Sequence, residues 1–141
     1  MSTVVEQIVQ ARLILSAQRS ALLRVTLRYG SEDPLAVRML FPTEYSLDSE
    51  TEGDEITWVF ARHLLAEGLD APAGLGDVHL RPTLGRRVMV ELRAAEGLAL
   101  LQFAAADLRR FLWHSYVAVP EGTETDHLDP DRALAELLGN A

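Results

Sequence analysis

Six segments of this sequence alternate apolar and polar side chains, and that period of two restricts the fold more than any other feature. Successive side chains of a strand point to opposite faces of a sheet. In residues 22–29, LLRVTLRY, every second side chain is apolar, which predicts a strand with one face buried and one exposed. The same pattern recurs in AVRMLF (36–41), EITWVF (55–60), DVHLRP (77–82), RVMVELRA (87–94) and LALLQF (98–103).

Residues 4–15, VVEQIVQARLIL, suit either a strand or a helix. We predict a strand, because the segment leads into a meander. Turn residues separate the strands that follow. Pro34 disfavours helix at the residue before it, and the glycines of TLGRR (83–87) and AAEGL (94–98) suit hairpin loops. The last strands are therefore expected to pair in sequence order.

Three helices are expected. The first covers about residues 61–67, with Gly68 placed to end it. The second covers about residues 105–116 and buries a stripe formed by Leu108, Phe111, Leu112 and Ser115. The third begins at Asp129, which suits the N-cap and is followed by a proline at the first helical position.

These elements predict an α+β fold with the order ββββα-βββαα. About seven strands form a curled, barrel-like antiparallel sheet, and about three helices pack at one end. The 141 residues are expected to form a single domain, 1–141. Within it, residues 44–55 carry six acidic side chains and no basic one, which predicts a mobile acidic loop.

Composition excludes several kinds of function. The chain has no cysteine, so disulfides, thiolate catalysis and cysteine zinc sites are ruled out. Its net charge of −8 opposes binding to phosphate backbones, and the arginine-bearing strand faces lack interleaved aromatics. The N-terminus has no basic region typical of a secretory signal, and no apolar run is long enough for a membrane span. A cytoplasmic location is the expectation.

No chemical motif stands out. The four histidines do not form a local metal-binding pair, and the acids around His127 are better explained as a helix start. GLGDV (74–78) lacks the third glycine of a phosphate-binding loop and enters a strand. Glu67 and Asp70 form a conceivable carboxylate pair, but Glu67 is expected at a solvated helix end. We expect no enzymatic activity, no metal and no cofactor.

The most concentrated stretch is TWVFARHLLAEGLD, residues 57–70. Together with PAGLGDV (72–78), LRYGSEDPLAV (27–37), EGLALL (96–101) and VPEGTE (119–124), it resembles the SsgA-like sporulation-specific cell division proteins of actinomycetes. The resemblance covers most of the chain. The side chains of this signature that we interpret as structural are Trp58, Phe60, Leu64, Leu65, Gly68 and Gly76.

The resemblance implies a fold similar to the whirly single-stranded nucleic-acid-binding proteins, a homotrimer, and action at division septa. It also implies a non-enzymatic role in positioning FtsZ or promoting its assembly, with FtsZ or another SsgA-like protein as partner. The polar residues Arg62, His63 and Glu67 are expected on the surface, either for partner binding or for self-association. Because fold alone does not carry function, nucleic-acid binding remains only the alternative.

Overall fold

The computed structural model describes residues 2–42 and 55–128, and of Glu55 only the backbone. Two predictions fall outside this range: the helix beginning at Asp129, and the acidic loop apart from its last residue.

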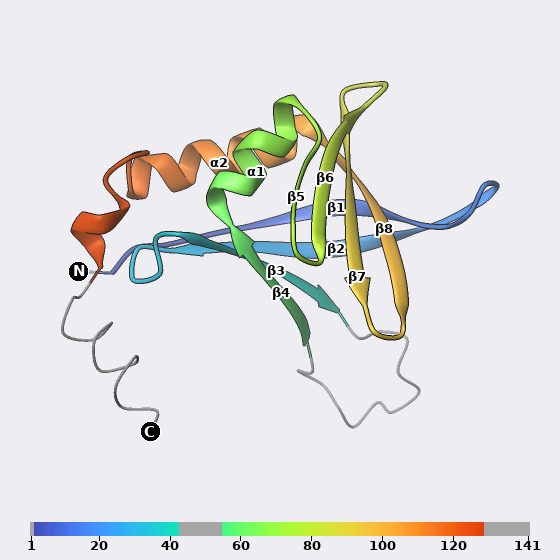
Figure 1. Cartoon of the computed structure of the whole chain (residues 1–141), viewed down its shortest axis with the longest axis horizontal. Helices are drawn as coiled ribbons and strands as arrows, with labels where there is room; N and C mark the ends of the chain where they lie inside the picture. Colours follow the sequence, from blue (N-terminus) through green and yellow to red (C-terminus); the bar gives the residue numbers. More distant parts are fainter. Residues whose placement is uncertain (1, 43–54, 129–141) are drawn as a thin grey trace.

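All described strands join one antiparallel sheet in the order β4-β3-β2-β1-β8-β7-β6-β5. Figure 1 shows that this sheet is strongly curled, so that β6, β7 and β8 cross the direction of β1 and β2. Their bounds are β1 Val4–Ser16, β2 Arg19–Gly30, β3 Ala36–Pro42, β4 Glu55–Ala61, β5 Ala73–Leu75, β6 Val78–Thr83, β7 Arg87–Ala94 and β8 Gly97–Ala104.

The sheet consists of two four-stranded meanders, β1–β4 and β5–β8, joined where β1 pairs with β8. Each meander is followed by one α-helix. The α+β class and the curled antiparallel sheet are confirmed, but the described residues contain eight strands, not seven. The strand that the sequence did not reveal is β5, whose three residues are too short to show a period of two.

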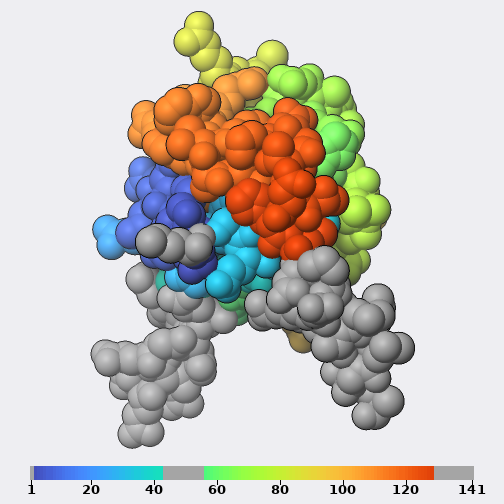
Figure 2. Space-filling model, turned by 90° about the vertical axis from the view of Figure 1, so that its left-hand side faces the viewer, coloured from blue at the N-terminus to red at the C-terminus, as the bar shows by residue number. Residues whose placement is uncertain are grey.

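The two helices lie side by side over one face of the sheet (Figures 1 and 2). They are α1, Arg62–Asp70, and α2, Ala105–Ala118; a 3-10 turn, η1, follows at Glu124–His127. The stripe predicted for the second helix is the buried face of α2: Leu108, Phe111, Leu112 and Ser115.

The prediction that Gly68 ends the first helix is wrong. The helix continues to Asp70, and Gly68 lies within it, pressed directly against the side chain of Leu80 on β6. Its role is close packing between helix and sheet and does not require a left-handed backbone.

The core fills the space between the helices and the concave face of the sheet. As the alternation predicts, the aromatic side chains of the strands point inward. Tyr29 and Phe103 are fully buried, Phe60 is nearly so, and Trp58 is half-buried at the margin. On β8, Leu101 is buried while Leu98 on the opposite face is 55% exposed. The sheet therefore keeps apolar side chains on a face that nothing in the described chain covers.

Candidate functional site

Arg62 is not on the surface, and this corrects the expectation from the sequence. It is the first residue of α1 and is only 2% exposed. The chain enters α1 directly from β4, and the Arg62 amide donates to the carbonyl oxygen of Leu35 at 2.8 Å. This bond fixes the helix start beside the loop before β3. The Arg62 side chain points into the interior.

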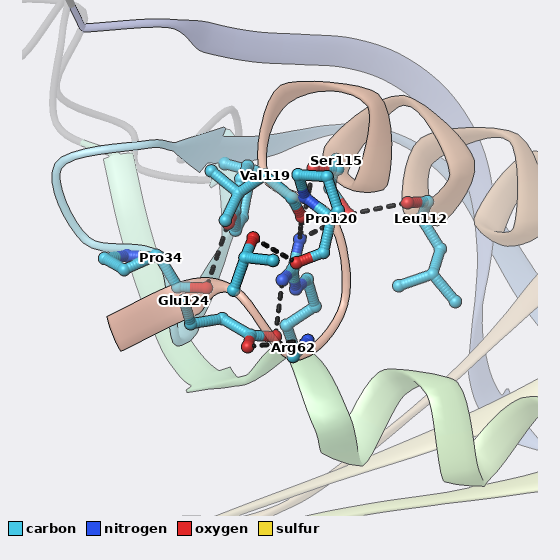
Figure 3. Close-up of polar contacts among 10 residues, drawn as sticks. Pro34, Arg62, Leu112, Ser115, Val119, Pro120 and Glu124 are labelled. Atoms are coloured by element: carbon cyan, nitrogen blue, oxygen red, sulfur yellow. Dashed lines mark hydrogen bonds and ion pairs between the residues drawn. The ribbon is translucent and has the colours of Figure 1, made fainter. Parts of the chain in front are cut away.

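Inside the protein, the Arg62 guanidinium binds the end of α2. One terminal nitrogen donates to the carbonyl oxygens of Ser115 at 3.1 Å and Val119 at 2.7 Å. The other donates to a carboxylate oxygen of Glu124 at 2.6 Å (Figure 3). The Ser115 oxygen also accepts the amide of Val119, which caps the helix. Carbonyl oxygens at a helix C-terminus carry a partial negative charge, so a cation stabilises them.

Two aromatic rings enclose the same guanidinium. Its central carbon lies 4.8 Å from the ring centroid of Tyr29 and 4.8 Å from that of Tyr116. A cation over an aromatic face is attracted by the negative charge of the ring face. The Tyr29 hydroxyl in turn donates to the Pro34 carbonyl oxygen at 3.0 Å. We call the arrangement of Arg62, Tyr29, Tyr116 and Glu124 the Arg62 clasp.

The ionisation of the clasp follows from its contacts. The hydrogen bond from Arg62 is the largest cause that lowers the pKa of Glu124 below its ordinary value, so the carboxylate stays charged at neutral pH. Burial raises the pKa of Tyr29, against the charge of Arg62. Burial, followed by the charge of Glu121, raises the pKa of Tyr116. Both phenols remain neutral, so the clasp holds one positive and one negative group.

The other two predicted site residues do lie on the surface. His63 and Glu67 face outward from α1, one turn apart, with side chains 75% and 54% exposed. Their side-chain atoms lie 2.7 Å apart, a contact that is an ion pair only when the histidine is protonated. An exposed pair of this kind contributes little to stability. Both side chains are therefore accessible to a partner.

The neighbouring helix α2 presents exposed apolar side chains that the sequence did not single out. Trp113 is 62% exposed, and Val117, one turn further on, is 64% exposed. The two helices contact each other, and Arg109 of α2 donates to the carbonyl oxygen of Leu69 in α1. We call His63, Glu67, Trp113 and Val117 the helical surface.

Metal sites and membrane-spanning helices each have requirements that can be compared with the described residues. Within residues 2–42 and 55–128, no three histidine, aspartate or glutamate side chains gather as metal ligands. The pKa shifts resolved in the same ranges all belong to the Arg62 clasp, where the groups are already bonded to one another. Neither of the two described α-helices has the length and apolar character needed to cross a bilayer.

Comparison with known proteins identifies the family. Residues 23–124 match the model of the family described as Streptomyces sporulation and cell division protein, SsgA. The chain belongs to the SsgA family. The match contains all the segments quoted for the resemblance and both helices, so the Arg62 clasp and the helical surface lie within the family domain.

Relatives within the SsgA family cover almost the whole chain. The sporulation-specific cell division protein SsgB of Salinispora tropica is 40% identical over 139 residues, 96% of this chain and 94% of that protein. SsgB of Streptomyces coelicolor is 38% identical and is matched along the full length of both chains. Both relatives are named sporulation-specific cell division proteins.

Two solved structures of SsgA-family proteins share the fold. One is an SsgB whose mutations correlate to longitudinal cell division during sporulation of Streptomyces coelicolor. It is 39% identical, with a TM-score of 0.80 over 90% of this chain and 97% of that one. The SsgA-like sporulation-specific cell division protein of Thermobifida fusca is 31% identical, with a TM-score of 0.80 over 96% of both chains. They support the curled sheet with two helices described above.

Proposed function

We propose that this SsgA-family protein regulates sporulation-specific cell division without catalysis, by binding other proteins. It acts at division septa in the cytoplasm, where it positions FtsZ or promotes its assembly, and it needs no cofactor. The observation that carries this proposal is the helical surface. An exposed tryptophan next to an exposed valine is unusual on a surface that serves only solvation, because tryptophan is enriched at the centres of protein interfaces.

The binding role falls to His63 and Glu67 together with Trp113. The first two supply a polar margin and Trp113 supplies the apolar centre, which is the ordinary composition of a protein interface. Arg62 supports this surface from beneath, since it holds the C-terminal end of α2 against the start of α1. A second member of the family is the other partner that this surface suits.

We expect the purified protein to co-sediment with FtsZ polymers of the same organism, and Trp113→Ala to weaken that binding by roughly tenfold or more. His63→Ala and Glu67→Ala should have smaller effects, because both side chains lie at the margin. The melting temperature should stay near that of the wild type, because Trp113 is largely exposed. Leu75→Ala, at an exposed leucine of β5, is the matched control.

Failure of the wild type to co-sediment with FtsZ would remove FtsZ from the proposal. Retardation of a single-stranded oligonucleotide at ~0.15 M salt would establish the alternative, a whirly-like nucleic-acid-binding module. Two observations speak against that module: the net charge is −8, and the strand aromatics Tyr29, Phe41, Phe60 and Phe103 are buried in the core.

We also propose a homotrimer, and light scattering should give three times the mass of the chain. The convex face of the sheet presents Ile8, Leu22, Val59 and Leu98, each more than half exposed. Apolar surface of this kind is commonly covered by a symmetry-related copy. A monomeric mass at tens of micromolar protein would contradict self-association. In a trimer of this kind, the helical surface on the opposite side of the sheet stays available for FtsZ.

A further inference from the structure

A groove lies where the tip of the β6–β7 hairpin rises past the ends of both helices (Figure 1). Its volume is about 610 Å³. Leu69 at the end of α1 and Val88 of β7 supply apolar lining, and Ala105 and Ala106 open α2 at its margin. The main chain fixes the position of the hairpin tip, because the amide of Ala105 donates to the Arg86 carbonyl oxygen at 2.9 Å. The groove is therefore part of the folded framework.

Three arginines line this groove in a protein whose net charge is −8. Arg86 and Arg87 come from the hairpin and Arg109 from α2, and all three are exposed. Arg87 donates to the side chain of Gln102 at 2.9 Å, which directs its guanidinium to the convex face of the sheet, so Arg86 and Arg109 supply the charge of the groove itself. Arg109 has an acidic neighbour, Asp70, at 3.6 Å, and that carboxylate is 78% exposed. The groove thus has a charge opposite to that of the whole chain.

The start of α2 adds to this charge. Ala104 occupies the N-cap and offers no side-chain hydrogen bond to the amides of the first turn. The Ala105 amide donates to the Arg86 carbonyl oxygen, and Asp107 in the same turn offsets part of the positive charge of the others. Such amides carry a partial positive charge. In the part of the chain that the structure describes, the Thr83 hydroxyl is the one buried side-chain polar atom without a hydrogen-bond partner, and Thr83 lines the groove. A buried polar atom without a partner is unusual and fits a site that a ligand completes.

The backbone at Arg86 is strained. Its φ is +59°, a left-handed conformation that disfavours side chains other than glycine, asparagine and aspartate. The neighbouring Gly85, at φ +79°, adopts the same region without strain. Strained non-glycine residues tend to occur at functional sites. The turn would form more easily with glycine at this position. The presence of arginine therefore indicates a functional role for its guanidinium.

We propose that this groove binds an acidic segment of a partner protein that carries glutamates or aspartates around one apolar side chain. The guanidiniums of Arg86 and Arg109 bind the carboxylates, and the apolar side chain packs against the floor formed by Leu69 and Val88. Leu84, 96% exposed at the hairpin tip, adds an apolar contact at the rim. The site is separate from the helical surface and gives the protein a second point of attachment.

A protein segment fits this site better than a single-stranded nucleic acid. The residues that line the groove include no aromatic ring on which a base could stack. The overall charge of −8 repels a long polyanion, whereas a short acidic segment meets only the local arginines. Arginine also binds carboxylates through paired, parallel hydrogen bonds.

Fluorescence anisotropy tests the proposal on the full-length protein. The probe is a short labelled peptide in which glutamates flank a central leucine. The measurement is made at ~0.15 M salt, where charges beyond the groove are largely screened. Arg86→Gly removes the guanidinium and relieves the backbone strain, so we expect a fold at least as stable as the wild type. Binding should weaken roughly tenfold with Arg86→Gly and with Arg109→Gln. Arg19→Gln, which makes the same charge change at the tip of the β1–β2 hairpin, should leave it unchanged.

Several outcomes would overturn the proposal. The first is that the peptide does not bind, and the second is that Arg19→Gln weakens peptide binding as much as the groove variants do. The third is that a peptide with glutamine in place of glutamate binds equally well. The fourth is that the protein binds oligothymidine in preference to the peptide. FtsZ co-sedimentation measured in parallel separates this test from that of the proposed function. If FtsZ binds and the peptide does not, the groove proposal is wrong and the division role stands. If the peptide binds and FtsZ does not, the groove proposal stands with a different partner.

Discussion

Arg62→Ala should lower the free energy of unfolding by about 3 kcal/mol or more, which chemical denaturation would measure directly. The substitution leaves the Glu124 carboxylate and the Val119 carbonyl oxygen without the Arg62 donor, and it removes one of the two donors to the Ser115 carbonyl oxygen. It also opens a space between the rings of Tyr29 and Tyr116. Both effects act in the same direction.

Three further variants identify the cause. Arg62→Lys keeps the charge but presents a single ammonium group, so it should fall between wild type and alanine. Combining Arg62→Ala with Glu124→Ala should destabilise by less than the sum of the two single changes, because the residues are bonded to each other. Arg19→Ala, at an exposed arginine, should change stability by no more than about 0.5 kcal/mol. If Arg62→Ala were as mild as Arg19→Ala, the clasp would not hold the fold together.

Gly68→Ala should destabilise the protein by about 1–3 kcal/mol, by overpacking. Two effects compete at this position. Helix propensity favours alanine over glycine by up to about 1 kcal/mol within a helix. Against this, a Cβ at Gly68 would overlap the Cβ of Leu80, which is attached to the backbone of β6 and has no rotamer that removes it. The clash should prevail, because relieving it requires α1 to move away from the sheet.

Thermal unfolding of Gly68→Ala gives the sign of the effect. Gly30→Ala is the control, because a Cβ there meets nothing within 4 Å and the backbone needs no positive φ. It should have a small effect. A Gly68→Ala variant more stable than the wild type would mean that helix propensity decides this position and that α1 packs less tightly on β6 than the structure shows.

Local patterns in the sequence determined the main elements of this fold. Alternation with a period of two predicted the long strands and which of their side chains face the core, including Tyr29 and Phe103. Spacing at three and four residues predicted the buried face of α2. Such patterns suffice because each strand or helix buries one face of its own, so the period is written in consecutive residues. Short separate segments, among them residues 57–70, carried the resemblance to the SsgA family, which the family match confirms.

Only the tertiary structure decided the roles of single residues. In the sequence, Arg62 stands between an alanine and a histidine at the start of a short helix, where an arginine is usually solvated. Its burial depends on hydrogen-bond partners that lie 53 to 62 positions later in the chain. From the sequence, Gly68 resembled a helix end. The reason for the glycine is its contact with Leu80 on β6, which the local sequence does not show. Long-range contacts of this kind leave no local periodicity, since they depend on how the meanders and helices meet. The groove at the β6–β7 hairpin has the same origin, because three elements distant in sequence bring Arg86 and Arg109 together.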